Sequence, residues 1–260
     1  MSATSTRTAL VTGAARRIGR EISLALARDG WDVAVHYATS RDDALDTVSQ
    51  IKALGRRAIA VNRDLAVEPG VMSLLAECEN ELAPVSCVVN NASLFEYDNV
   101  ARFTGDHLAR AMRTNAAAPI MLARALHQHL AGDARGVVIN LLDQKLENPN
   151  PDFFSYTLSK AALKEATTLL AIALAPKVRV VGIAPGITLA SNLQSDSGFV
   201  VAHGKTPLGR SSTAGDIAQA AVYLANAAAV TGTILLVDGG QHLVPSSRDV
   251  MFLSESPAEA

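Results

Sequence analysis

The sequence is poor in cysteine, has no basic block and has no long hydrophobic run. Two cysteines in 260 residues, Cys78 and Cys87, cannot build a disulfide framework, and we expect both thiols to be buried among apolar neighbours. The first residues lack the charged and apolar segments of a signal peptide, which together with the scarce cysteine predicts a reducing, cytoplasmic setting.

The charge balance argues against a polymer partner. Lys and Arg total 23 and Asp and Glu total 25, a formal net charge of -2, and no stretch would neutralise several phosphates of a nucleic acid. The apolar runs are far shorter than the ~20 residues that span a bilayer, so we expect no membrane partner. Because 49% of the residues are hydrophobic, we expect the chain to bury surface against copies of itself.

Short apolar runs alternate with helical patterns along the chain, without an internal repeat or linker. The runs are apolar on both faces, which is typical of parallel strands covered by helices on each side. We expect strands at 8–11, 32–37, 57–61, 85–91, 136–142, 179–185 and 233–239, and helices at 18–29, 41–54, 68–82, 105–131, 154–175 and 213–227. The pattern predicts a single α/β domain over residues 1–260, a doubly wound parallel sheet of seven strands that binds ligands at the carboxyl ends of the strands.

Three segments lie outside this alternation. Residues 1–6 are expected to be a flexible N-terminus. Residues 191–212 lack a clear periodicity and are expected to form a lid over the edge of the sheet. Residues 241–260 form a tail whose "RDVMFL" is too apolar for a solvated end, so we expect it to dock, a neighbouring subunit being one candidate surface.

A loop that suits a phosphate follows the first expected strand. In "TGAARRIG", Gly13 and Gly19 let the backbone turn tightly and expose the N-terminus of the next helix to an anion, which is how a pyrophosphate is held. Arg17 stands where a nucleotide loop of this length usually has a second glycine. A strand-to-helix turn without a ligand is the alternative interpretation.

The end of the second expected strand, "HYATSR", contains no acidic residue. A fold that selects NAD usually has Asp or Glu there to bind the ribose 2′-hydroxyl. Ser40 and Arg41, with Arg16 and Arg17 across the groove, instead supply donors and positive charge for a 2′-phosphate. The alternative is that these arginines are solvated surface charges.

Tyr156 and Lys160 in "YTLSK" lie four residues apart and therefore share one face of a helix. A nearby ammonium lowers the free energy of a phenolate, so this tyrosine can exchange a proton with a carbonyl oxygen or an imine nitrogen. Such a pair also occurs by chance, but this one begins the helix after the fifth expected strand, beside the nucleotide end of the sheet.

These features, together with "NNAS" at 90–93, "TNAAAP" at 114–119 and "APG" at 184–186, resemble the short-chain dehydrogenase/reductases in order and spacing. The resemblance covers nearly the whole chain, from Arg7 to Gly240. It implies a Rossmann-like fold, a nicotinamide cofactor and a homotetramer.

Within this resemblance, Tyr156 is the proton donor, Lys160 bridges it to the nicotinamide ribose, and Asn115 holds a water in a proton relay. Asp64 contacts the adenine and Asn91 lies under the cofactor. The residues expected at the cofactor are Gly13, Arg16, Arg17, Ile18, Gly19, His36, Tyr37, Ser40, Arg41, Asp64, Leu65, Asn91, Ala92, Tyr156, Lys160, Pro185, Gly186 and Thr188, the last of these at the nicotinamide carboxamide.

One residue departs from the general pattern of this family. Most members carry a serine ahead of the tyrosine, at the position that Asp143 takes here. A serine hydroxyl polarises a ketone oxygen, whereas a carboxylate would repel the negative charge that develops on it. Beside a protonatable ring nitrogen an aspartate fits better, because it can hydrogen-bond Tyr156 and pass a proton to the nitrogen. A local backbone cap is the alternative role for Asp143.

That departure, with the arginine loop, "HY" and Ser40, and Phe95 after "NNAS", closely resembles the pteridine reductases and bacterial dihydropteridine reductases. This resemblance implies NADPH and a pterin or dihydropterin substrate. Phe95 then forms one face of a sandwich with the nicotinamide, unless it is a core aromatic. Ala38 and Thr39 replace the larger or basic residues of that pattern. The residues expected at the substrate are Arg17, Ser93, Phe95, Asp143 and Tyr156.

Two other functions remain open at this point. One is an NADPH-dependent reductase of another carbonyl, such as a 3-oxoacyl thioester, a sugar or a quinone. The other is a non-catalytic nucleotide-binding protein, against which the set Tyr156, Lys160 and Asn115 argues. His127 and His129 point in different directions on the expected helix, so we expect no metal site.

Overall fold

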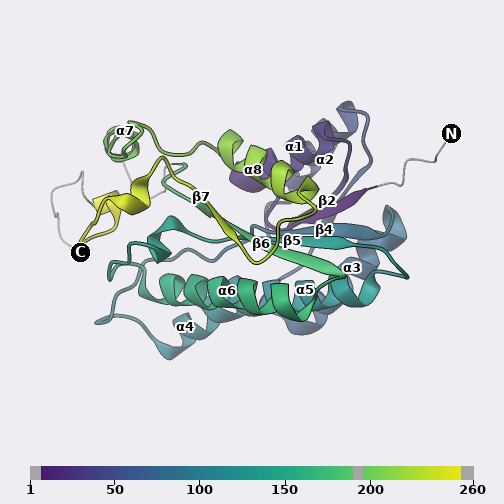
Figure 1. Cartoon of the computed structure of the whole chain (residues 1–260), viewed down its shortest axis with the longest axis horizontal. Helices are drawn as coiled ribbons and strands as arrows, with labels where there is room; N and C mark the ends of the chain where they lie inside the picture. The colour runs from purple at the N-terminus through teal and green to yellow at the C-terminus, as the bar shows by residue number, and fades with distance from the viewer. Residues whose placement is uncertain (1–6, 190–195, 253–260) are drawn as a thin grey trace.

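The computed structural model describes residues 7–189 and 196–252; the segment 1–6, part of the expected lid and the end of the tail lie outside it. This part contains one parallel sheet of seven strands, and Figure 1 shows the sheet at the centre with helices on both faces. The strands are β1 (Thr8–Val11), β2 (Asp32–Tyr37), β3 (Ala58–Asn62), β4 (Val85–Asn90), β5 (Gly136–Leu141), β6 (Val178–Pro185) and β7 (Ile234–Val237). Their order across the sheet is β3-β2-β1-β4-β5-β6-β7, so the predicted fold is confirmed.

Two helical layers enclose the sheet, and each has its own apolar core (Figure 1). The strands β1 and β5 are buried along their whole length, which is why their sequences do not alternate between polar and apolar residues. On one face lie α1 (Arg17–Arg28), α2 (Arg41–Ala53) and α8 (Ala214–Asn226), and on the other α3 (Glu68–Glu81), α5 (Ala118–His129) and α6 (Phe154–Ala173).

Cys78 and Cys87 are both fully buried, as expected. Burial raises the pKa of each thiol to about 12, so both act as small apolar side chains. Within residues 7–189 and 196–252, no cluster of His, Cys, Asp and Glu could hold a metal ion, and no helix is long and apolar enough to cross a membrane.

The single helix expected at 105–131 is wrong in its middle. The structure has α4 (Gly105–Met112), a π-helical turn (Arg113–Ala117) and then α5. Pro119 explains the widening, because it has no N–H to give to the carbonyl of Asn115, the acceptor that an α-helix would pair with it. The result places Asn115 in a wide turn of the kind often found at functional sites.

The segment expected to be an irregular lid contains a helix, α7 (Asp196–Gly204). The described part of the tail, residues 241–252, docks on its own chain through short turns at Gln241–Leu243 and Val250–Phe252. The second of these turns packs near α7, and Figure 1 shows both at the same end of the molecule. Leu253, the last residue of "RDVMFL", lies outside the described residues.

The strand order reverses between β1 and β4, where the two halves of the sheet meet. Thr12, directly after β1, fastens the loops on either side of this point. Its Oγ1 accepts hydrogen bonds from the backbone N–H groups of Asn91 and Ala92, each at 3.0 Å. The loops after β1 and β4 are therefore held side by side at the carboxyl edge of the sheet.

A chain of buried polar side chains crosses the sheet below this edge. Asn90 donates to the Oδ1 of Asn140 at 2.8 Å, and Asn140 donates to the Oγ1 of Thr167 on α6 at 2.9 Å. Asn140 and Thr167 are fully buried. Because water cannot replace these bonds, they fix β4, β5 and α6 relative to one another.

Asn140→Ala should lower the free energy of unfolding by ~2 kcal/mol, because it leaves buried groups of Asn90 and Thr167 without their partner. Urea unfolding measures this loss. Asn62→Ala is the control: Asn62 also donates two hydrogen bonds, to Tyr37 and Ala38, but it is exposed and water can replace it. An equal loss in both variants would contradict the role given to the buried chain.

Candidate active site

The glycine loop runs from β1 into α1. Gly13 has φ +61° and Arg17 has φ +56°, so the arginine adopts the left-handed conformation that the expected glycine would take without strain. A Cβ on Gly19 would lie 2.2 Å from the carbonyl oxygen of Gly13, which only a glycine avoids. Asn91 closes the loop from the β4 side by donating to the carbonyls of Thr12 and Gly13, at 2.9 and 3.0 Å.

His36 braces the same loop from β2. Its Nδ1 accepts the Gly13 N–H at 3.1 Å, which leaves Nε2 to donate to the carbonyl of Arg63, also at 3.1 Å. The imidazole is therefore neutral. Burial lowers the pKa of His36 to about 4, although the Arg63 carbonyl favours the protonated form. The side chain of this expected cofactor residue thus acts on the loop itself.

A cavity of about 470 Å³ opens above the loop. Its described lining contains arginines and hydroxyl groups but no acidic side chain. The lining residues are Gly13, Ala15, Arg16, Arg17, Ile18, Gly19, His36, Tyr37, Ala38, Thr39, Ser40, Asn91, Ala92, Ser93, Phe95 and Tyr156. It thus brings together most of the residues expected at the cofactor.

Three residues of the expected cofactor set do not line either of the two cavities at this edge. Arg41 is exposed at the first position of α2. Asp64 is exposed and accepts the backbone N–H of Ala66 at 2.9 Å. Leu65 is buried in the core beneath α3 and α5. Their contact with a cofactor stays a prediction.

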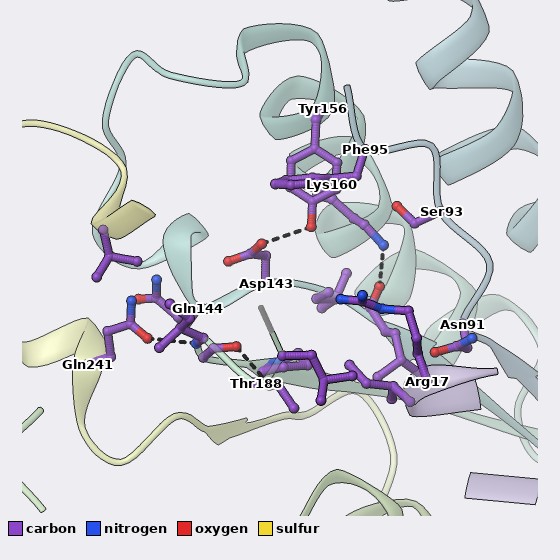
Figure 2. A pocket seen from close by; sticks show the side chains of 18 of the residues that line it. Arg17, Asn91, Ser93, Phe95, Asp143, Gln144, Tyr156, Lys160, Thr188 and Gln241 are labelled. Carbon is purple, nitrogen blue, oxygen red and sulfur yellow. Dashed lines mark hydrogen bonds between the residues drawn. The ribbon is translucent and has the colours of Figure 1, made fainter. Parts of the chain in front are cut away.

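A second cavity, of about 260 Å³, adjoins the first and contains the expected catalytic groups. Figure 2 shows Asp143, Tyr156 and Lys160 converging in it beside Arg17, Phe95 and Thr188. Residues that line both cavities are Arg17, Ile18, Asn91, Ser93, Phe95 and Tyr156. Pro185, Gly186 and Thr188, at the end of β6, line the smaller cavity alone.

Tyr156 donates its hydroxyl hydrogen to Oδ2 of Asp143 at 2.8 Å (Figure 2). Burial raises the pKa of Tyr156 well above its ordinary value, and the neighbouring carboxylate of Asp143 raises it further. Burial also raises the pKa of Asp143, although the hydrogen bonds from Lys145 and Tyr156 oppose this. Both acidic groups therefore resist ionisation, and the tyrosine keeps its proton.

Lys160 lies on the same face of α6 but does not bond the phenol. Its Nζ donates to the carbonyl of Leu141 at 2.7 Å and lies 5.8 Å from the centre of the Tyr156 ring. Burial lowers the pKa of Lys160 to about 8, and Asp143 favours its charged form. The pairing that the sequence suggested, in which the ammonium stabilises a phenolate, is thus outweighed by the aspartate.

Asn115 is fully buried behind these groups. Its amide donates to the carbonyl of Leu94 and to Ser159 Oγ, both at 2.9 Å, while its Oδ1 accepts the Leu94 N–H at 2.7 Å and the Ser93 hydroxyl at 3.3 Å. The side chain is therefore occupied in fixing the loop after β4. A relay water would have to hydrogen-bond the backbone of the π-helical turn instead of this side chain. The role of Asn115 in a proton relay stays a prediction.

Phe95 forms an aromatic wall of both cavities. It is 43% exposed and stacks on the buried Phe153, with ring centres 4.3 Å apart and planes at 14°. The Phe95 ring also meets Tyr156 edge-on at 4.7 Å. Phe153 has φ +53° at the residue before α6, so the same residue supports the wall and starts the helix that carries Tyr156.

A family model described as short chain dehydrogenase matches residues 7–198. The chain belongs to the short-chain dehydrogenase family. It resembles the structure of FolM alternative dihydrofolate reductase 1 from Brucella suis in complex with NADP, with a TM-score of 0.89 and 38% identity over 94% of this chain and 98% of that one. It also resembles the structure of FolM alternative dihydrofolate reductase 1 from Brucella canis complexed with NADP, with a TM-score of 0.86 and 37% identity over 92% of this chain and 95% of that one. The 3-oxoacyl-[acyl-carrier-protein] reductase FabG of Staphylococcus epidermidis is 31% identical over 91% of this chain and 99% of its own length.

This short-chain dehydrogenase is therefore an oxidoreductase, as the sequence predicted. Several residues of its smaller cavity were not predicted. Gln144 follows Asp143, Gln241 accepts the N–H of Ile187 at 2.9 Å, and Asp249 and Val250 come from the tail. Gln241 directly follows the glycines after β7, so the rule that ligands bind beyond strand ends would have found it.

His36→Phe should weaken the pH dependence of stability between pH 6.5 and pH 4, the interval between the ordinary and the folded-state pKa of His36. There the unfolded chain binds a proton that the folded histidine refuses, so stability falls as the pH falls, by roughly 3 kcal/mol for this group. Urea unfolding at pH 7 and pH 4 measures the slope. His127→Phe, on α5, controls for the loss of a histidine elsewhere. If the free energy of unfolding changed equally with pH in His36→Phe and in the unmodified chain, the role given to the neutral His36 would be contradicted.

Proposed function

We propose that this short-chain dehydrogenase is an NADPH-dependent reductase of a pterin or dihydropterin ring. The observation that carries the proposal is the hydrogen bond between Tyr156 and Asp143, in a cavity walled by Phe95. A carboxyl group beside the proton donor suits a ring nitrogen, because it can supply a proton, and its ionised form would oppose the negative charge that develops on a ketone oxygen. The likeness to the FolM alternative dihydrofolate reductases supports the same class of substrate.

The larger cavity suits a cofactor with a 2′-phosphate. Gly13 and Gly19 shape the turn at the start of α1, where backbone N–H groups face an anion. Arg16, Tyr37 and Ser40 line the part of the cavity after β2, and its described lining has no carboxylate to bind a ribose 2′-hydroxyl or repel a phosphate. The FolM structures in complex with NADP support this choice. When bound, the nicotinamide supplies a hydride.

The residues of the smaller cavity bind the substrate and move one proton. Phe95 offers an exposed aromatic face for a flat ring, and Ser93 and Arg17 offer hydrogen-bond donors at its edge. The Tyr156 hydroxyl gives its proton to the ring nitrogen next to the carbon that is reduced. A protonated Asp143, acting in turn as the donor of their shared hydrogen bond, then gives its own proton to the tyrosine oxygen. Lys160, fixed on the Leu141 carbonyl, keeps a positive charge beside the pair.

Asp143→Ser tests the substrate class. The unmodified protein should oxidise NADPH with dihydrobiopterin, dihydromonapterin or dihydrofolate, and the variant should lose ~100-fold or more in kcat because the carboxyl no longer supplies a proton. Asp143→Asn is the matched variant, which keeps the shape and loses the proton. NADPH consumption measures the rate.

The similarity to FabG supports a second candidate, reduction of a 3-oxoacyl thioester or another carbonyl. Under that function Asp143→Ser should retain or gain activity on a 3-oxoacyl thioester. Indifference of the unmodified protein to all three pterins would overturn the pterin proposal.

Arg17→Gly tests the contribution of Arg17 to substrate binding, because Arg17 lines both cavities. Glycine adopts φ +56° freely, so the melting temperature should stay equal or rise, while kcat/KM for the pterin falls by about tenfold. Arg16→Gly is the control. Arg16 lines only the larger cavity, so its loss should raise KM for NADPH more than KM for the pterin. Unchanged kinetics for Arg17→Gly would make Arg17 an ordinary surface charge.

The homotetramer and the cytoplasmic setting stay predictions. Leu158, Leu169 and Ile172 share one face of α6 and are 41%, 59% and 74% exposed. Large apolar side chains gathered on a helix face support association with other copies of the chain.

A further inference from the structure

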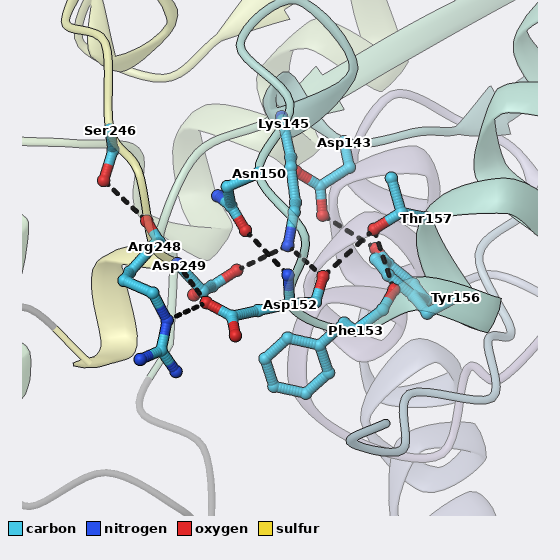
Figure 3. A network of polar contacts seen from close by, with 10 residues as sticks. All are labelled: Asp143, Lys145, Asn150, Asp152, Phe153, Tyr156, Thr157, Ser246, Arg248 and Asp249. Atoms are coloured by element: carbon cyan, nitrogen blue, oxygen red, sulfur yellow. Dashed lines mark hydrogen bonds and ion pairs between the residues drawn. The ribbon is translucent and has the colours of Figure 1, made fainter. Parts of the chain in front are cut away.

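The tail is tied to the active site by a network of polar groups, of which Lys145 and Asp152 are buried (Figure 3). Lys145 lies two residues after Asp143, and its side chain is only 4% exposed. The Nζ of Lys145 donates to the carbonyl of Asp152 and to Oδ2 of Asp249, the latter at 3.2 Å. Asp152 in turn binds the tail, since it accepts from Arg248 Nε and from the Asp249 N–H, each at 2.8 Å.

Aromatic contacts of Phe252 hold the tail from a second side. Phe252 meets Tyr97 at 5.4 Å and stacks on Phe153 with ring centres 6.1 Å apart and planes at 15°. Asp249 is thus fixed between two anchors, with its side chain 16% exposed. Asp249 and Val250 line the same cavity as Asp143, which makes the tail one wall of the proposed substrate site of its own chain.

Lys145 and Asp249 have opposite effects on Asp143. The backbone N–H of Lys145 donates to Asp143 Oδ1 at 2.8 Å, so the two residues belong to one turn, and an ammonium held there favours the ionised aspartate. Asp249 favours the protonated form, and its negative charge acts on the pKa of Asp143 more strongly than the positive charge of Lys145 does. An ion pair this buried keeps its strength in salt.

We propose that Asp249 is a positioning residue of the active site: by pairing with Lys145 it keeps that buried ammonium from ionising Asp143. Asp143 then retains the proton that the reaction consumes, a use that rests on the proposed function. The other groups that face Asp143 are Tyr156 and Lys160 from α6 and Arg17 from the glycine loop, while Gln144 and Gln241 are neutral. The tail therefore has to be docked for Asp143 to keep its proton.

The test is a direct titration of Asp143 by carbon-13 NMR of its carboxyl group in the full chain, assigned by the loss of the signal in Asp143→Asn. Asp249→Asn should move the midpoint to lower pH by ~1 pH unit, since Asp143 then loses a nearby negative charge and Lys145 loses the carboxylate that it pairs with. Lys145→Met should move it to higher pH, and the double variant should lie between the two. These signs differ from those of a merely loosened tail, which would shift both single variants alike.

Glu147→Gln is the matched control. Glu147 pairs with Lys164 at 2.6 Å close to Asp143 in the sequence, but this pair is exposed, so the midpoint should stay where it is. An unchanged midpoint in Asp249→Asn, or shifts of the same sign in both single variants, would overturn the inference.

The pH profile of kcat for pterin reduction separates the two proposals. Its alkaline limb, where the proton donor is lost, should move in Asp249→Asn by the same amount as the NMR midpoint. If the midpoint moves and no pterin is reduced, the proposed function fails and the inference about Asp249 stands. If pterins are reduced and the midpoint does not move, the inference fails alone.

Discussion

The hydrogen bond from Tyr156 to Asp143 joins two acidic groups that burial has taken away from water. Two such groups cannot both be ionised at this separation, so at least one proton stays in the pair. The neighbouring charges follow from this constraint. Lys160 points to a backbone carbonyl instead of the phenol, and Lys145 is neutralised by Asp249. In this arrangement Tyr156 stays protonated and does not become a phenolate.

Uncharged groups hold the glycine loop between β1 and α1 in place. Thr12, Asn91 and the unprotonated His36 together satisfy its backbone from three different strand ends. Because none of these fastenings carries a charge, the positive charge of the larger cavity comes from the arginines of its rim. The loop can therefore keep its shape whether or not an anion lies above it.

The sequence predicted the features that depend on neighbouring residues. The seven strands, the glycine loop and the pair Tyr156 and Lys160 each have a local pattern. The structure forms all seven strands and places the loop and the pair together at one edge of their sheet. The π-helical turn was missed although Pro119 lies inside the expected helix 105–131, because an interior proline indicates a disturbed helix and not which kind of turn replaces it. The contribution of the tail was missed for a different reason. Lys145 and Asp249 are separated by 104 positions, and no periodicity relates them.

The left-handed Phe153 has a consequence for the wall that Phe95 forms. Its ring lies behind Phe95 without any exposed surface, and Tyr97 and Phe252 close around it. Phe95 is therefore backed by packed rings on the side away from the cavity, and moving it in that direction would disturb Phe153. Displacing Phe153 would also disturb the start of α6, the helix that carries Tyr156. One residue, Phe153, thus couples the position of the aromatic wall to the position of the helix start.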